Sequence, residues 1–381
     1  MQQADFNPFL IRGYVDKEYF CDREEETQKL IKLLRNGNDV VLAAPRRIGK
    51  SGLIHHCFAQ DDLKGYYVFY VDIYSTNNLA DFVSLLGTEI ADKLKAKGKK
   101  ALQKFWDMVM SLRAGISFDP MGEASVNIQV GEIKESKVTL KEIFDFLSNA
   151  DRPCIIAIDE FQQIMEYPER NTEALLRTYI QKCNNAHFIF SGSHRHMMTQ
   201  MFLSASRPFY QSASHMPLKC IDLDVYTEFA QRLFAKGNKK LEAEVMMAVY
   251  EEVDGLTWYV QKLLNELYSM TSEGETCSME YFPIAMNNIL DSYDNNYTDM
   301  IRLLSARQKA LVLAIAREGV ATNVQSSAFV TKYHLNSASS VQSGIKTLLE
   351  KAYITEHSGG YRIYDLFMQR WLERQFTTDN H

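Results

Sequence analysis

Paired cysteines are missing from this sequence of 381 residues. Its six cysteines are scattered and none forms a CxxC pair, so we expect neither a zinc site nor a disulfide framework. Long apolar runs are missing too, because the longest, such as 154–158, falls far short of the roughly 20 residues that span a bilayer. The first residues hold no basic segment followed by an apolar stretch, so no signal peptide is expected. The sequence predicts a soluble, cytoplasmic protein that makes no membrane contact.

An excess of positive charge is also lacking. The 42 Lys and Arg against 48 Asp and Glu give a net charge of −6, which excludes a chain that coats nucleic acid with its whole surface. Hydrophobic residues at 46% and charged residues at 24% are typical of a globular protein, and the length predicts two or three domains. Any contact with nucleic acid has to come from a local patch.

Short apolar runs alternate with helical patterns over the first two thirds of the chain, which predicts an α/β fold with a parallel sheet flanked by helices. The strand candidates are rich in Val, Ile, Phe and Tyr, as strands buried on both faces should be. They cover 39–44, 66–73, 154–159, 187–191 and 216–223. Alternating apolar residues between Gly115 and Glu132 predict an inserted hairpin, and the role of this 114–137 insert is left open.

Two further patterns follow the sheet. Helical periodicity without strand signals, from about 225 to 304, predicts a helical lid. Three helical patterns and then two short strand-like runs come after residue 305, which is the order of a winged helix-turn-helix. They cover 306–317, 326–333, 337–351, 352–355 and 360–364. We therefore predict an α/β core at 1–224, a helical lid at 225–304 and a winged helix at 305–381.

The segment APRRIGKS, from Ala44 to Ser51, directly follows the first predicted strand and precedes a helix. It matches the phosphate-loop (Walker A) pattern GxxxxGKS/T, with Ala44 in place of the first glycine. Backbone amides at such a helix N-terminus can hold phosphate oxygens. Lys50 is expected to reach the β- and γ-phosphates, and the Ser51 hydroxyl to ligate Mg²⁺. The residues predicted to bind nucleotide here are Pro45, Arg46, Arg47, Ile48, Gly49, Lys50, Ser51 and Gly52.

Two acids, Asp159 and Glu160, end the apolar run CIIAIDE in the Walker B arrangement. A strand end places them at the carboxyl edge of the sheet, where the phosphate loop also lies. Asp159 is predicted to hold Mg²⁺ and Glu160 to polarise the attacking water. Paired acids can also simply end a strand at the surface, but their order after the phosphate loop favours a site for ATP and Mg²⁺.

A third buried run, HFIFSGS at 187–193, ends in small polar residues. In phosphate-loop ATPases a polar residue at this place senses the γ-phosphate, which makes Ser191 or Ser193 a candidate. A serine here can equally cap the next helix. The sequence leaves both roles open for each of the two.

With FCDREE at 20–25 and RPFYQS at 207–212, these motifs resemble the archaeal and bacterial AAA-type ATPases that carry a Pro-Arg-Arg phosphate loop. That family lies near the signal-transduction ATPases of the STAND group and near the origin-recognition ATPases. The resemblance covers nearly the whole chain, lid and winged helix included. It implies a P-loop NTPase fold that binds ATP and Mg²⁺.

The resemblance also implies roles for residues outside the two Walker motifs. Arg23 falls in a segment that lies near the adenine in the family, although Asp22 replaces the usual glycine. Arg207 falls where AAA-type proteins often keep an arginine finger, and a structural salt bridge is the equal alternative. The segment 255–259, GLTWY, is similar to the family's G-x-P-x-Y, with Thr257 in place of the proline.

The winged helix is the most ambiguous part of the sequence. Residues 305–381 hold nine Lys and Arg against six Asp and Glu, which favours nucleic acid only weakly. Lys346 and Arg362 are the cations expected to meet the phosphates of double-stranded DNA. A winged helix can also bind a protein partner. The third helix is expected to expose Asn336, Ser339, Ser340, Gln342, Ser343 and Lys346.

The favoured interpretation is a Mg²⁺-dependent ATPase that acts as a conformational switch. A nucleotide-gated DNA-binding regulator with slow hydrolysis is one alternative, and a protein-docking scaffold without turnover is another. Metal binding by His55, His56, His194 or His196 is not expected, because their spacing is poor for metal ligands. The oligomeric state is left open.

Overall fold

The computed structural model describes residues 7–109, 117–118, 124–125 and 136–378. The chain divides into two compact units. One contains residues 10–229 together with 256–259, and the other contains residues 1–9, 230–255 and 260–381. Among the described helices, none combines the length and apolarity that crossing a bilayer requires.

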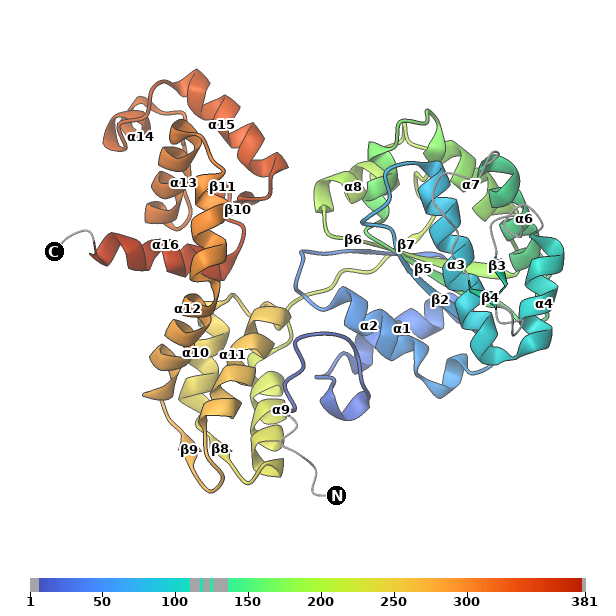
Figure 1. The fold of residues 1–381 in the computed structure, drawn as a ribbon, viewed down its shortest axis with the longest axis horizontal. Coiled ribbons are helices and arrows are strands. Elements are labelled where there is room, and N and C mark those ends of the chain that lie inside the picture. Colours follow the sequence, from blue (N-terminus) through green and yellow to red (C-terminus); the bar gives the residue numbers. More distant parts are fainter. Residues whose placement is uncertain (1–6, 110–116, 119–123, 126–135, 379–381) are drawn as a thin grey trace. The chain divides into compact units, whose positions relative to one another are not determined.

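A five-stranded parallel sheet forms the centre of the first unit (Figure 1). Its strand order is β2-β5-β6-β1-β7. The strands are β1 (Val40–Ala43), β2 (Tyr67–Asp72), β5 (Cys154–Asp159), β6 (Ala186–Gly192) and β7 (Ser214–His215). Four of them lie where the sequence predicts them. The fifth prediction, 216–223, is wrong: β7 ends directly before it and is short, because Pro217 has no N–H to continue the ladder after Met216.

Helices cover both faces of this sheet, because alternate residues of each strand point to opposite sides. In β5, Ile155 and Ala157 pack in one apolar cluster, whereas Ile156 and Ile158 pack in the other. The first cluster contains residues of α1 (Glu24–Arg35) and α2 (Lys50–Phe58). The second contains residues of α3 (Leu79–Lys97), α4 (Lys99–Met108), α6 (Ser136–Ser148), α7 (Thr172–Lys182) and α8 (Arg195–Leu203).

The predicted insert is described only in part. Two-residue strands β3 (Ser117–Phe118) and β4 (Ala124–Ser125) pair antiparallel, as a hairpin should. The alternating positions Val126, Ile128 and Val130, on which the prediction rested, lie outside the described residues.

Helices dominate the lid region, as the sequence predicts. They are α9 (Leu223–Lys236), α10 (Ala243–Glu252), α11 (Thr257–Met270) and α12 (Tyr281–Arg302). The short parallel pair β8 (Lys240–Leu241) and β9 (Thr276–Cys277) was not predicted. Each of these strands has two residues, too few for a period-two pattern to be visible.

The winged helix has the predicted order of elements, with boundaries within about two residues. Its helices are α13 (Ala306–Glu318), α14 (Ser327–Lys332) and α15 (Ala338–Glu350), and serine side chains cap the N-termini of all three. The antiparallel wing consists of β10 (Ile354–His357) and β11 (Gly360–Ile363). A further helix, α16 (Leu366–Thr378), was not predicted. It packs on α12, where Trp371 donates to Asp294 over 2.8 Å and Phe367 stacks on Tyr293.

Candidate nucleotide site

The phosphate loop connects β1 to α2, and Lys50 is the first residue of that helix. Gly49 caps the helix with φ at 98°, a left-handed conformation that glycine adopts without steric cost. Lys50 is only 6% exposed, and its ammonium donates to the carbonyl oxygens of Ala44 and Pro45, over 2.9 and 3.0 Å. Burial lowers the pKa of Lys50, and the nearby Glu160 and Asp159 carboxylates partly oppose this. The carbonyl groups of the loop thus bind the ammonium of Lys50.

The segments predicted to be the Walker A and Walker B motifs meet at Asp159. The Ser51 hydroxyl donates to Asp159 Oδ2 over 2.7 Å, and the hydroxyl of Tyr70 donates to the same oxygen. Asp159 Oδ1 accepts the backbone N–H of Glu160 over 3.0 Å. Burial alone would raise the pKa of Asp159, but the nearby hydroxyls of Ser191, Tyr70 and Ser51 and the Lys50 ammonium bring the pKa below its ordinary value. The carboxylate is therefore held in its charged form.

Glu160 follows the strand with φ at 54° and is surrounded by donors. Its Oε2 accepts from the Ser193 hydroxyl over 2.6 Å, from the Ser193 backbone over 3.3 Å and from Gln162 over 2.5 Å. Arg46 of the phosphate loop lies 3.7 Å from Oε1 and also donates to the Ser193 hydroxyl over 3.2 Å. Of the two candidate serines, Ser193 contacts Glu160, whereas Ser191 is fully buried beside Asp159.

The first residues of α11 contact the phosphate loop within the same unit. The Arg47 guanidinium lies 4.5 Å from the ring centroids of both Trp258 and Tyr259, and it donates to the Tyr259 hydroxyl. Thr257 donates through its hydroxyl to Ile48 O over 3.1 Å. A proline at position 257 would lack this hydroxyl, so the departure from the family pattern adds a hydrogen bond.

Comparison with known proteins decides the family. Residues 20–263, well over half of the chain, match the sequence profile described as "ATPase domain predominantly from Archaea". The chain belongs to this family. A second profile, described as "Probable winged helix domain", matches residues 295–374. No curated protein matches the sequence.

Two solved structures show how far the fold of this archaeal-type ATPase extends. A Walker-type ATPase of Pyrococcus abyssi is 20% identical, with a TM-score of 0.67 over 96% of this chain and 99% of that chain. The ORC2 protein of Aeropyrum pernix, solved in ADPNP–ADP complexes, is 14% identical, with a TM-score of 0.57 over 98% of this chain and 99% of that chain. At these identities the likeness shows the fold alone. The predicted P-loop fold with a C-terminal winged helix is confirmed.

Mg²⁺ prefers hard oxygen ligands, and the residues of this ATPase fit that preference. The Ser51 hydroxyl and the Asp159 carboxylate, 2.7 Å apart, face each other beside the phosphate loop. Elsewhere in the described part of the chain, His, Cys, Asp and Glu form no group of three that could hold a metal ion. His56 instead stacks on Phe20 at 4.3 Å, and His55 lies against Tyr70 at 4.4 Å.

Arg23 lies under the phosphate loop of the ATPase. It is 3% exposed and donates to Ile48 O over 3.3 Å and to Glu26 over 2.8 Å. Gly52 lies in α2, and an added Cβ there would lie 3.3 Å from the Phe20 ring, which would have to shift by a few tenths of an ångström. Arg23 therefore supports the loop at Ile48, and contact between Arg23 and a base stays a prediction.

Arg207 forms an ion pair with Glu173, the second residue of α7. The Glu173 side chain is 10% exposed and that of Arg207 is 28% exposed. Burial raises the pKa of Glu173, and the guanidinium partly opposes this. The structure thus contains the salt bridge that was one of the two interpretations of Arg207, and the arginine-finger role stays a prediction.

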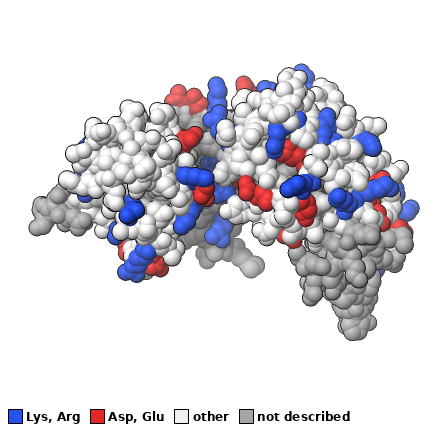
Figure 2. Space-filling view, turned by 90° about the horizontal axis from the view of Figure 1, so that it is seen from above, with Lys and Arg blue, Asp and Glu red and all other residues white. Residues whose placement is uncertain are grey.

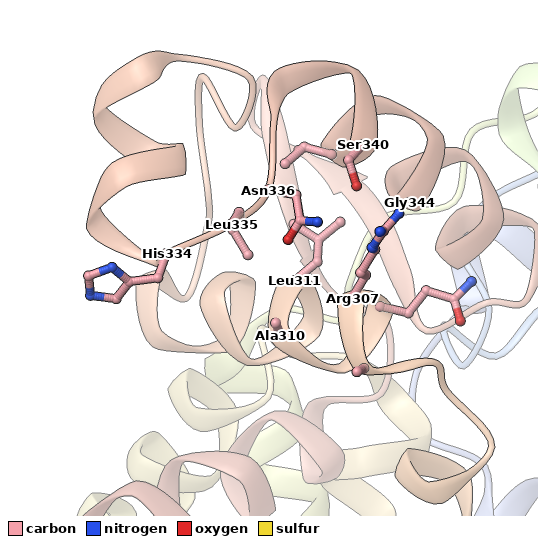
Figure 3. A pocket seen from close by; sticks show the side chains of 11 residues that line it. Arg307, Ala310, Leu311, His334, Leu335, Asn336, Ser340 and Gly344 are labelled. Carbon is pink, nitrogen blue, oxygen red and sulfur yellow. The ribbon is translucent and has the colours of Figure 1, made fainter.

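The third helix of the winged domain presents a polar face. The side chains of Asn336, Ser339, Gln342, Ser343 and Lys346 are exposed as predicted, and Ser340 is half-buried. Figure 3 shows Asn336 and Ser340 beside Leu311 and Leu335, around a pocket of about 180 Å³ between α13 and α15. In Figure 2, described Lys and Arg side chains alternate with Asp and Glu on the face in view, without a continuous basic stripe.

Arg362 departs from its prediction. Its side chain is 17% exposed and forms an ion pair with Asp254, next to the end of α10. Little of its surface can therefore meet a phosphate. Lys346 does point outward, with its side chain 81% exposed and Glu350 at 4.0 Å.

Two residues of the site were not found in the sequence. Tyr70 lies in the middle of β2, two residues before the strand ends, and reads as an ordinary core position. Gln162 lies in a buried 3₁₀ turn after the acids. The sequence shows that Gln162 comes two residues after Glu160. Only the structure shows that the two side chains form a hydrogen bond.

Proposed function

We propose that this protein is a Mg²⁺-dependent ATPase that uses nucleotide binding and hydrolysis as a conformational switch. One observation carries the proposal: Ser51, Asp159, Glu160 and Ser193 converge beside the phosphate loop, linked by hydrogen bonds of 2.6 to 3.0 Å. Family membership supports nucleotide binding by this site.

Lys50 binds the phosphates by exchanging its hydrogen-bond partners. Its ammonium now donates to two loop carbonyls, and on ATP binding it turns these hydrogen bonds to the β- and γ-phosphate oxygens. The exchange restores charge compensation to a cation that burial otherwise penalises. The backbone amides from Arg47 to Ser51, at the N-terminus of α2, bind the same phosphates.

Ser51 and Asp159 are the residues that would hold Mg²⁺. The ion supplies charge neutralisation at the phosphate oxygens when it is bound. Asp159 is prepared for this because its hydroxyl donors keep the carboxylate ionised. The Tyr70 hydroxyl keeps one of these hydrogen bonds when the Ser51 hydroxyl turns away, so it fixes the orientation of Asp159.

Glu160 acts as the base that orients water. Three donors hold its Oε2, which leaves Oε1, 3.7 Å from Arg46, to accept a hydrogen bond from the attacking water. Ser193 connects this base to Arg46 of the phosphate loop. A γ-phosphate that attracts Arg46 would therefore also rearrange the donors around Glu160.

Turnover of ATP, measured with and without duplex DNA, tests the proposal. We expect the release of phosphate to depend on Mg²⁺ and to be abolished by EDTA. A Ser51→Ala variant, in which Gly52 and the rest of the loop are unchanged, should lose this release. Tight ATP binding without release of phosphate, in both the presence and the absence of DNA, would contradict the proposal.

The polar face of α15 favours a second candidate, a nucleotide-gated DNA-binding regulator. ATP-dependent duplex binding without turnover would support that alternative.

A further inference from the structure

A lysine-rich surface lies on the ATPase unit, away from both Walker motifs. Between residues 95 and 104, five of ten residues are lysine and none is acidic, in a chain whose net charge is −6. All five are exposed: Lys95, Lys97, Lys99, Lys100 and Lys104, which together are called the lysine surface below.

The lysine surface is built on a rigid helical hairpin. Helix α3 ends at Lys97, Gly98 turns the chain with φ at 118°, and α4 begins at Lys99 (Figure 1). The opposite side of α4 is anchored in the core, where Phe105 is fully buried and packs edge-on against Phe146 at 5.0 Å. The lysines therefore point outward from a fixed framework.

The charges of the lysine surface are not balanced within the described structure. Lys104 donates to a neutral acceptor, Asn149 O, over 3.2 Å, and none of the five forms an ion pair with a described residue. Among the acids of the neighbouring helices, Asp107 accepts from Gln103 and Asp145 pairs with Lys141, whereas the exposed Asp92 lies three residues before Lys95 on α3. Cations in the first turn of α4 also oppose its helix dipole. These unbalanced charges lower the stability of the helical hairpin. The binding of an anionic partner at this surface would compensate for the loss.

The chemistry favours nucleic acid over a lipid surface. A membrane-binding helix carries large apolar side chains beside its lysines. The large hydrophobic residues that are exposed in the described structure include none from α3 or α4. Between the lysines, Ala96, Gly98 and Gln103 are exposed, and the apolar Ala101 and Leu102 are half-buried. Since the same chain matches a winged helix profile, a module that commonly contacts DNA, DNA is the matching polyanion.

We propose that the lysine surface binds the phosphate backbone of double-stranded DNA, as a contact of the ATPase unit separate from the winged helix. Such contacts carry no sequence information and position the protein on the duplex. The proposal does not depend on ATP hydrolysis. A protein without turnover but with this contact would refute the proposed activity and leave the inference standing.

The first test uses the unaltered protein. Lysines are acetylated at low reagent concentration with and without a random-sequence duplex, and the modified positions are identified by mass spectrometry. We expect the duplex to protect the lysine surface several-fold, while the exposed Lys29 and Lys182 react as before. Equal reactivity at all of these positions would overturn the proposal.

The second test compares two quadruple variants with the same change in charge. One replaces Lys95, Lys97, Lys99 and Lys100 by glutamine, and the control replaces the scattered, exposed Lys29, Lys32, Lys182 and Lys219. Each lost phosphate contact lowers the slope of log affinity against log salt by about 0.9. We expect the first variant to lose roughly two to four units of slope and at least about tenfold in affinity. The control should stay within about twofold.

Two outcomes of this comparison would overturn the inference. In one, both variants lose the same affinity, which would make the effect one of net charge alone. In the other, the first variant loses binding to vesicles of anionic phospholipid while duplex binding is unchanged, which would identify a lipid surface. Retention of ATP binding by both variants shows that they are folded.

Discussion

The buried ammonium of Lys50 dominates the nucleotide site at the scale of residues. We predict that Lys50→Ala abolishes binding of Mg²⁺-ATP, because the loop amides alone cannot balance the charge of the triphosphate. Titration of the protein with a fluorescent ATP analogue measures this. The exposed Lys182→Ala serves as control, with unchanged affinity. Wild-type affinity in Lys50→Ala would show that the phosphate-loop assignment is wrong.

Binding and chemistry separate at Glu160. Glu160→Gln keeps an oxygen that can accept the hydrogen bonds from Ser193 but removes the carboxylate that orients water. We predict unchanged ATP affinity and a turnover lower by about 10²–10⁴-fold. The matched control is Glu166→Gln, an exposed acid of the same 3₁₀ turn. If turnover survives in Glu160→Gln, another group is the base.

The pH dependence of stability has an identifiable source in Asp39. Burial raises the pKa of this carboxyl from 3.8 to about 6, although it accepts the Phe188 N–H over 2.8 Å. The folded state therefore binds a proton more tightly than the unfolded state, and stability falls as the pH rises from about 4 to above 6. The difference amounts to about 3 kcal/mol at most.

Asp39→Asn should remove this dependence, because the amide keeps the acceptor for Phe188 and carries no charge. Near pH 7.5 we predict that the variant has a higher free energy of unfolding than the wild type, and that the gain vanishes near pH 4. Urea denaturation at both pH values measures it. The exposed Asp92→Asn is the control. A variant that is less stable at pH 7.5 would contradict the argument.

At the scale of elements, the beginning of α11 determines how firmly the phosphate loop is held. Arg47 lies against two aromatic rings, and such a cation–π contact contributes about 1 to 2 kcal/mol when it is partly desolvated. We predict that Trp258→Ala weakens ATP binding about 5- to 30-fold. Trp258→Phe, which keeps a π face, should retain most of the affinity. Equal affinities of the wild type and Trp258→Ala would show that the ring does not support the loop.

Helices, strands and loops whose pattern lies within their own segment were predictable from the sequence. Contacts between residues distant in sequence were not. The strand before Asp159 and the loop before Lys50 show their pattern within ten residues, so their place at one sheet edge follows from topology. Nothing near Arg207 in sequence shows that Glu173 is its partner, 34 residues away. Helix α16 was missed because its apolar residues pack on α12, and no local sequence pattern shows that contact.

At the scale of the whole molecule, charge is distributed in local groups. A net charge of −6 would repel a polyanion at long range, so DNA contact depends on patches. The structure offers two of different kinds: the lysine surface of the ATPase unit and the polar face of α15 with its single outward cation. The first is suited to backbone phosphates and the second to base edges.

The two cations of the winged helix that the sequence predicts to meet DNA should therefore behave differently from each other. Lys346 is exposed and Arg362 is paired with Asp254, so only Lys346 can exchange its counterions for a DNA phosphate. We predict that Lys346→Ala lowers the slope of log affinity against log salt by about one unit and leaves stability unchanged. Arg362→Ala should leave that slope unchanged and lower the free energy of unfolding by about 1 kcal/mol, as for a partly exposed ion pair.

Salt titrations of duplex binding and urea denaturation of both variants test this contrast. Because the ATP site lies in the other compact unit, ATP affinity should be the same in both variants and serves as the control for folding. A loss of slope in Arg362→Ala would mean that the ion pair with Asp254 opens on DNA. If the wild type has no salt-sensitive affinity for duplex DNA with or without ATP, α15 is a surface for a protein partner, and its exposed serines and amides serve that contact instead.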